Sequence, residues 1–318
     1  MSVLSWLASA PPDAAIEIAP DAVSIAALGS RGAEAIVQAY GSADLAPGAL
    51  IPALTGHNIV DRPAVVQALR TACERAGIRP SRAALVIPDV AARVALVRFD
   101  QIPVRRDDLD RLIQWQMKKS LPFGVEDAAI THSAGVRSDG GGEFIVVAAR
   151  RDVVAEYEGV CDEAGIHAGL VDVATLSVVN LYLAGSAPTG DWLIVHIRPE
   201  YTSIAIMRGS DLIFFRTRAE GDPEPLADVV HQTAMYYQDR LSGHGLSRVF
   251  AGGRSRLAGG VEVAIREIEA RLSTVVEPLD PTTVAPLVDR ISVTPKQGAA
   301  LAPLVGMLLR GRKATVAA

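Results

Sequence analysis

A segment near the start of this chain recurs in its second half, and this repeat limits the folds that the chain can adopt. Residues 16–28 read IEIAPDAVSIAAL and residues 195–207 read VHIRPEYTSIAIM. The offset is constant, because 197 minus 18 and 205 minus 26 both give 179. The repeat predicts two related halves facing each other across a cleft, with the turn between the two strands of each copy at that cleft. The identical pairs are Ile18 and Ile197, Pro20 and Pro199, Ser24 and Ser203, Ile25 and Ile204, and Ala26 and Ala205.

Composition excludes several classes of protein. A chain of 318 residues is long enough for two cores. A net charge of −5 leaves no basic field for nucleic acid. The histidine spacing fits no zinc motif, and there is no C-x-x-C, nucleophile elbow or P-loop. No apolar run approaches the ~20 residues that span a bilayer, and the first residues do not read as a signal peptide. We therefore expect a cytoplasmic protein, unless a partner holds it at a membrane.

Each half reads as the same series of elements, β-β-β-α-β. In the first half, strands are expected at 14–19, 22–28 and 33–40, a helix at about 62–76 and a strand at 83–88. Asp61 and Pro63 favour the start of that helix, and Gly77 favours its end. In the second half, strands are expected at 192–197, 201–207 and 211–218, followed by a helix at about 225–241 and a strand that ends in a glycine pair.

The stretch between the halves is too long to be a simple connection. It carries its own apolar runs, including a strand at 93–99 and a helix at 107–121. We expect the opening part of the first lobe at 1–88 and a second lobe at 191–318. Residues 89–170 form an inserted subdomain with the return to the first lobe, and 171–190 form a helix and hinge.

A duplicated unit with an insertion in its first half is the plan of the actin-like, ribonuclease-H-like ATPase fold. Four segments are similar to PilM, the actin-like protein of type IV pilus assembly. They are QWQMKKSLPF at 114–123, the strand and helix segment at 146–180, VFAGGRSRLAGG at 249–260 and ALAPLVGMLLR at 300–310. The resemblance covers nearly the whole chain. It implies an α/β class with a duplicated, two-lobed actin-like fold and an inserted α/β subdomain.

The resemblance also implies where ATP would bind. Such folds hold the phosphates in two hairpin turns, each with an Asp-x-Gly pattern whose glycine admits close backbone approach. Here Glu17 and Ala19 stand at the first turn, and His196 and Arg198 stand at the second. Each turn continues into a proline, which has no N–H to donate. Other positions that the resemblance places near a nucleotide are Glu220, Gly221, Gly252 and Gly253.

Two interpretations of these turns follow. In one, they are ordinary turns of a pseudo-ATPase that has lost hydrolysis and needs no cofactor. In the other, Arg198 and His196 meet phosphate oxygens directly in place of Mg²⁺, so that ATP binds without turnover. Neither interpretation assigns a catalytic residue or a metal ligand.

Partner binding is the second function that the resemblance implies. PilM proteins bind the short cytoplasmic tail of PilN, a single-span membrane protein, in a groove beside the inserted subdomain. The candidate residues here are Trp115, Leu121, Pro122 and Phe123. Trp115 lies at the edge of an apolar stripe, so a half-buried core side chain is the ordinary interpretation and a partner anchor is the alternative. Pilus motor ATPases or platform proteins are further partners to consider. No nucleic acid and no direct membrane insertion are expected.

The resulting hypothesis is a scaffold of a type IV pilus or related secretion machine, peripheral to the inner membrane through a PilN-like partner. One alternative is an ATP-binding or ATP-hydrolysing switch of the same fold. Another is a sugar or acyl kinase of the superfamily, which needs a catalytic aspartate in the cleft. The sequence offers no convincing one.

Overall fold

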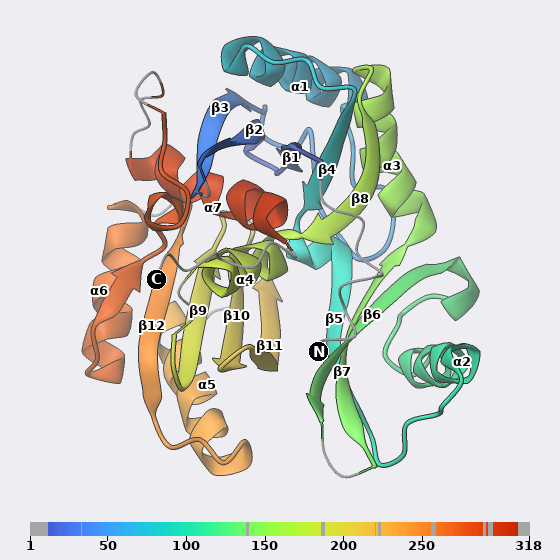
Figure 1. The fold of residues 1–318 in the computed structure, drawn as a ribbon, viewed down its shortest axis with the longest axis vertical. Coiled ribbons are helices and arrows are strands. Elements are labelled where there is room, and N and C mark those ends of the chain that lie inside the picture. Colours follow the sequence, from blue (N-terminus) through green and yellow to red (C-terminus); the bar gives the residue numbers. More distant parts are fainter. Residues whose placement is uncertain are drawn as a thin grey trace.

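The computed structural model describes residues 12–32, 34–137, 140–185, 188–219, 221, 224–255, 259–288, 291 and 295–310. These residues form two five-stranded sheets and one three-stranded sheet. In Figure 1 the first sheet lies at the top, the second at the lower left and the small sheet at the lower right. No helix in the described part of the chain is long and apolar enough to cross a membrane.

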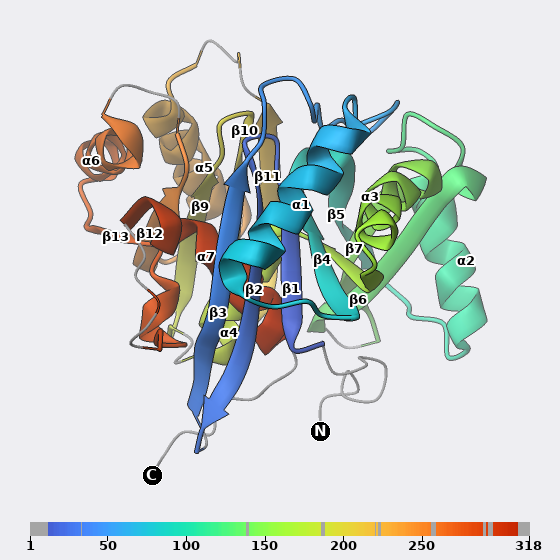
Figure 2. The same ribbon diagram turned by 90° about the horizontal axis from the view of Figure 1, so that it is seen from above.

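The first lobe is a sheet with strand order β3-β2-β1-β4-β8. Its first three strands pair antiparallel, while β4 pairs parallel to β1 and to β8. Helices α1 and α3 cover the outer face of this sheet (Figure 2). The strands are β1 (Ala14–Ile18), β2 (Ala22–Arg31), β3 (Glu34–Asp44), β4 (Arg82–Ile87) and β8 (His167–Val173), and the helices are α1 (Arg62–Ala76) and α3 (Arg151–Glu163).

Helix α1 begins and ends where local chemistry predicts. The Asp61 side chain accepts a hydrogen bond from the backbone N–H of Ala64, and Pro63 lies in the first turn. Gly77 closes the helix in the left-handed conformation, with φ of 66°. The predicted helix at about 62–76 is therefore confirmed.

The second lobe repeats the first, with strand order β11-β10-β9-β12-β13. The repeat extends to the register. Glu17 on β1 lies opposite Ser24, and His196 on β9 lies opposite Ser203, so both pairs keep the offset of 179. The elements are β9 (Asp191–Ile197), β10 (Tyr201–Arg208), β11 (Asp211–Ala219), α5 (Leu226–Arg240), β12 (Leu246–Gly253), α6 (Gly260–Leu272) and β13 (Val276–Pro278).

Two helices lie between the large sheets, α4 (Ala174–Ala184) and α7 (Pro295–Leu309) (Figure 1). They pack against each other and against the inner faces of both sheets, forming one apolar core that joins the lobes. The helices are in close contact at Gly306, where a Cβ atom would overlap the carbonyl oxygen of Ser177. The prediction of two related lobes in an α/β fold is confirmed.

The inserted subdomain is the small antiparallel sheet, with order β5-β7-β6 and helix α2 against it. After β7 the chain enters α3 and β8, which belong to the first lobe. Helix α2 is shorter than the expected 107–121, because the chain passes into tight turns before Pro122 and proline disfavours helix at the preceding residue. The elements are β5 (Ala92–Phe99), α2 (Arg106–Met117), β6 (Ala128–Arg137) and β7 (Gly142–Arg150).

Candidate functional site

The two repeated turns close in the same way. In the first, the N–H of Ala19 donates to the carbonyl of Ala22 over 3.0 Å; in the second, the N–H of Arg198 donates to the carbonyl of Tyr201 over 2.8 Å. Successive strand residues point to opposite faces. Glu17 therefore shares the inner face of β1 with the buried Ala15, and His196 shares the inner face of β9 with Ile194. Both strands thus direct a polar side chain toward the other lobe.

A buried ion pair joins the two turns. The guanidinium of Arg198 donates from Nη2 to the carboxylate of Glu17, and their side chains are only 2% and 4% exposed. Burial raises the pKa of the Glu17 carboxyl, against the opposing effect of Arg198. Glu17 in turn raises the pKa of Arg198 against the effect of burial, so the guanidinium stays charged. The sequence-predicted residues Glu17 and Arg198 therefore meet each other directly.

A second ion pair crosses the lobes beside the first. Nη1 of Arg254, which follows β12, donates to Oδ2 of Asp21 in the first turn over 2.7 Å. Burial alone would raise the pKa of Asp21, but the nearby charges of Arg198 and Arg254 hold it below its usual value. The first turn is thus fixed through two carboxylates, each paired with an arginine of the second lobe.

A third contact is centred on Asp89, which follows strand β4 and is 1% exposed. Its carboxylate accepts three hydrogen bonds: from the N–H of Thr175 over 2.9 Å, from the hydroxyl of Thr175 and from the hydroxyl of Ser203 over 2.6 Å. Burial raises its pKa, and these hydrogen bonds oppose the rise. Because Ser203 lies on β10, this carboxylate also ties the first lobe to the second.

His196 completes this network. Its Nδ1 lies 2.8 Å from the hydroxyl oxygen of Thr175. That hydroxyl already donates its one proton to Asp89, so it accepts from a protonated Nδ1. Burial, together with the charge of Arg198, lowers the pKa of His196 well below its usual value, which keeps the imidazole neutral. Its Nε2 is buried without a hydrogen-bond partner among the described residues.

Sequence reasoning missed Asp89, although its position after a buried strand and a proline was visible. The kinase alternative needs a carboxylate that can reach a substrate hydroxyl. Asp89 is instead fully buried and engaged by Thr175 and Ser203 within the protein. The structure therefore gives the kinase alternative no free aspartate at this position.

Packing within the second lobe explains the glycine pair. A Cβ on Gly252 would lie 2.7 Å from the Cβ of Leu279. Gly253 has φ of 129°, and a Cβ there would overlap the carbonyl oxygen of Ile197. Close packing against Leu279 therefore explains Gly252, and close packing against the Ile197 backbone explains Gly253, whether or not a purine binds here. Glu220 lies outside the described residues, and Gly221 is exposed with open space around it.

This arrangement does not fit a magnesium–triphosphate group. The Arg198 and Glu17 side chains occupy the space between the two turns, and the prolines that follow, Pro20 and Pro199, are buried without an N–H to offer. No group of three or more His, Cys, Asp or Glu residues that could hold a metal ion occurs in the described part of the chain. Binding of a nucleotide at these turns would first require the ion pair to open.

Comparison with known proteins identifies the family. The sequence pattern of the type IV pilus assembly protein PilM matches residues 15–240. The chain belongs to the PilM family. This confirms the family that the sequence motifs suggested. Curated protein sequences give no significant match.

One solved structure supports the fold, and two others are more distantly similar. A PilM–PilN type IV pilus biogenesis complex aligns with a TM-score of 0.80 at 15% identity, covering 95% of this chain and 99% of that one. The cytoplasmic domain of EpsL, an inner-membrane component of the type II secretion system of Vibrio cholerae, aligns with a TM-score of 0.46 at 11% identity over 77% of this chain and 82% of that one. A Bacteroides thetaiotaomicron protein with an actin-like ATPase fold aligns with a TM-score of 0.47 at 8% identity, covering 90% and 93%.

The second region to consider in this PilM-family chain is the inserted subdomain. Ile113 and Met117 of α2 are buried against its sheet. Trp115 is 57% exposed instead of half-buried in a core, and Nζ of Lys119 lies 4.2 Å from its ring centroid. The other three candidate residues differ among themselves, since Leu121 is buried, Pro122 is exposed and Phe123 is partly buried.

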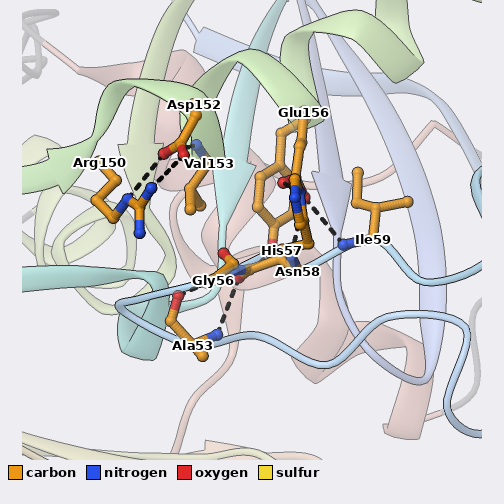
Figure 3. Close-up of polar contacts among 10 residues, drawn as sticks. Ala53, Gly56, His57, Asn58, Ile59, Arg150, Asp152, Val153 and Glu156 are labelled. Carbon is orange, nitrogen blue, oxygen red and sulfur yellow. Dashed lines mark hydrogen bonds and ion pairs between the residues drawn. The ribbon is translucent and has the colours of Figure 1, made fainter. Parts of the chain in front are cut away.

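A polar cluster in the first lobe joins the loop before α1 to α3, the helix that follows the inserted sheet (Figure 3). Oε2 of Glu156 on α3 accepts from the N–H groups of Asn58 and Ile59 over 2.8 and 3.1 Å, and Oε1 lies 2.6 Å from Nδ1 of His57. The buried Asn58 side chain donates to the carbonyl of Ala53 over 2.9 Å. At the start of the same helix Arg150 pairs with Asp152. The loop before α1 is thereby held against α3 beside the inserted sheet.

Proposed function

We propose that this protein is a scaffold of a type IV pilus or related secretion machine. It binds the short cytoplasmic tail of a PilN-like membrane protein and does not hydrolyse ATP. Through that partner it is held at the inner face of the membrane. Family membership supports the machine, and the solved PilM–PilN complex, which covers this chain almost completely, supports the type of partner.

The buried pair of Glu17 and Arg198 is the observation that carries the proposal. Hydrolysis in this fold requires turns that admit phosphate and a metal ion. Here one turn supplies an arginine to the other turn's carboxylate, and burial strengthens their attraction. The lobes are then held together by the chain's own side chains and not by a nucleotide. Without ATP hydrolysis, the function that remains for this fold is the binding of a partner protein.

The tail site is assigned to the inserted subdomain, around Trp115, Pro122 and Phe123. Exposed tryptophan is enriched among residues that dominate binding energy. Pro122 and Phe123 continue from the same helix, and the Arg150 guanidinium lies 5.9 Å from the Phe123 ring centroid. Leu121 supports this surface from the subdomain core. An extended tail in a groove combines main-chain hydrogen bonds with side-chain pockets.

Trp115→Ala is expected to weaken tail binding by at least about 2 kcal/mol, roughly 30-fold. The change should leave the midpoint of thermal unfolding nearly unaltered, because an exposed side chain contributes little to folding. The measurement is fluorescence anisotropy with a labelled peptide of the cytoplasmic tail of the PilN-like protein from the same cell.

The matched control is Val275→Ala, which removes an apolar side chain that is 75% exposed on the second lobe. It should bind the tail like the wild type. If Trp115→Ala bound the tail as tightly as the wild type does, the tail site would not lie around Trp115. Absence of tail binding by the wild-type protein would contradict the scaffold proposal itself.

A further inference from the structure

A groove of about 310 Å³ lies between the inserted subdomain and the second lobe. One wall is the start of β5, at Ala92, Arg93 and Val94. The other wall is the segment 214–217 of β11. These two strands lie next to each other at the lower centre of Figure 1. None of the residues discussed for the nucleotide turns or for the tail site lines this groove.

Both walls are strands at the edge of their sheets, β5 in the order β5-β7-β6 and β11 in the order β11-β10-β9-β12-β13. An edge strand presents backbone N–H and C=O groups that have no partner in the sheet. Among the described residues, no backbone hydrogen bond joins β5 to β11. The groove is therefore bordered by hydrogen-bonding groups on both sides.

Two exposed arginines provide the charge of the groove. The side chains of Arg93 and Arg216 form no hydrogen bond or ion pair with any residue that the structure describes. The other arginines near the lobe interface differ, since Arg198 and Arg254 are both paired with carboxylates. The chain as a whole is acidic, with net charge −5. A local pair of free guanidinium groups on such a chain attracts carboxylates to this place specifically.

Aromatic side chains provide the apolar part. Phe215, which lines the groove, packs against the core of the first lobe and against the core between the lobes. Phe214 stacks with Tyr236 of α5 at a centroid distance of 5.6 Å, and Tyr236 is 47% exposed. Arginine, tyrosine and phenylalanine are among the residues enriched at protein interfaces.

We propose that this groove binds an extended acidic segment of a partner protein. A carboxylate of that segment lies between Arg93 and Arg216, and a neighbouring apolar side chain packs on Phe214 and Tyr236. A nucleic acid is disfavoured as the occupant, because two arginines make no basic stripe for a phosphate backbone. This surface is separate from the tail site. The proposal that it binds an acidic segment can therefore be tested independently of the proposed scaffold function.

The test uses the full chain and a random heptapeptide library displayed on phage. Selection on the wild-type protein, with the Arg93→Glu/Arg216→Glu variant as counter-target, is expected to enrich peptides in which Asp or Glu neighbours an aliphatic or aromatic residue. A labelled consensus peptide should then bind at least tenfold more weakly to Arg93→Ala and to Arg216→Ala, and more weakly at higher salt. Arg266→Ala, at an exposed position on α6, should bind it unchanged.

Circular dichroism and thermal unfolding of each variant establish that it is folded, which an exposed substitution should not alter. Three results would overturn the proposal. They are no enrichment over the counter-target, consensus peptides without acidic residues, and binding that is equal in the arginine variants. Tight binding of a labelled single-stranded oligonucleotide that depends on the same two arginines would also overturn it, in favour of a nucleic-acid site.

Discussion

Arg198→Ala is expected to lower the free energy of unfolding by about 3–5 kcal/mol. The substitution leaves the Glu17 carboxylate buried between the lobes, where no other cation of the described part of the chain is in hydrogen-bond contact with it. It also leaves unfilled the volume that the guanidinium occupied. Chemical denaturation followed by circular dichroism measures the change, and the slope with denaturant shows whether unfolding remains a single transition.

The matched control is Arg248→Ala, because Arg248 also pairs with a glutamate, Glu277, but in an exposed position with side chains 42% and 38% exposed. Its removal should lower stability by less than about 1 kcal/mol. The double variant Glu17→Leu/Arg198→Met should recover much of the loss, since apolar groups of similar volume need no partner. A loss from Arg198→Ala no larger than that of the exposed control would contradict the importance of the buried pair.

Gly306→Val is expected to destabilise the fold by about 3 kcal/mol, near the upper end for overpacking. A side chain here would overlap the carbonyl oxygen of Ser177, a backbone atom on α4 that cannot move aside alone. The two helices between the sheets would have to separate, which disturbs the core that joins the lobes. The midpoint of thermal unfolding, compared with the wild type at equal concentration, measures the effect.

Gly298 supplies the comparison within the same helix, because nothing that the structure describes lies within 4 Å of the position of its Cβ. Gly298→Ala should leave stability equal or raise it by about 0.5–1 kcal/mol, since alanine favours helix. Opposite effects of the two substitutions would show that close packing is what requires Gly306. If both substitutions changed stability only slightly, α4 and α7 would be packed more loosely than the structure shows.

Much of the fold could be predicted from this sequence because the internal repeat and the local helix and strand patterns indicate the same elements. The constant offset of 179 predicted two equivalent turns, and Asp61 and Gly77 predicted the start and the end of α1. The end of α2 was predicted too far along the chain. The apolar period continues past Met117, but the turns before Pro122 end the helix.

The side-chain contacts between the lobes could not be predicted from local sequence patterns. Glu17 and Arg198 are 181 positions apart, and no local pattern states that two turns will place opposite charges together. Arg198 read equally well as a ligand for phosphate, because a guanidinium suits phosphate and carboxylate alike. Trp115 was similarly ambiguous, since helical spacing puts it at the border of the apolar stripe and only the packing of α2 leaves it 57% exposed.

We propose that the buried pair of Glu17 and Arg198 occupies the place where other proteins of this fold hold a nucleotide. Titration calorimetry of the full chain with ATP, in the presence and absence of Mg²⁺, can decide this. We expect no heat of binding in either buffer and no release of phosphate. Magnesium-dependent binding, with phosphate release that disappears in Glu17→Ala, would show that the proposal is wrong.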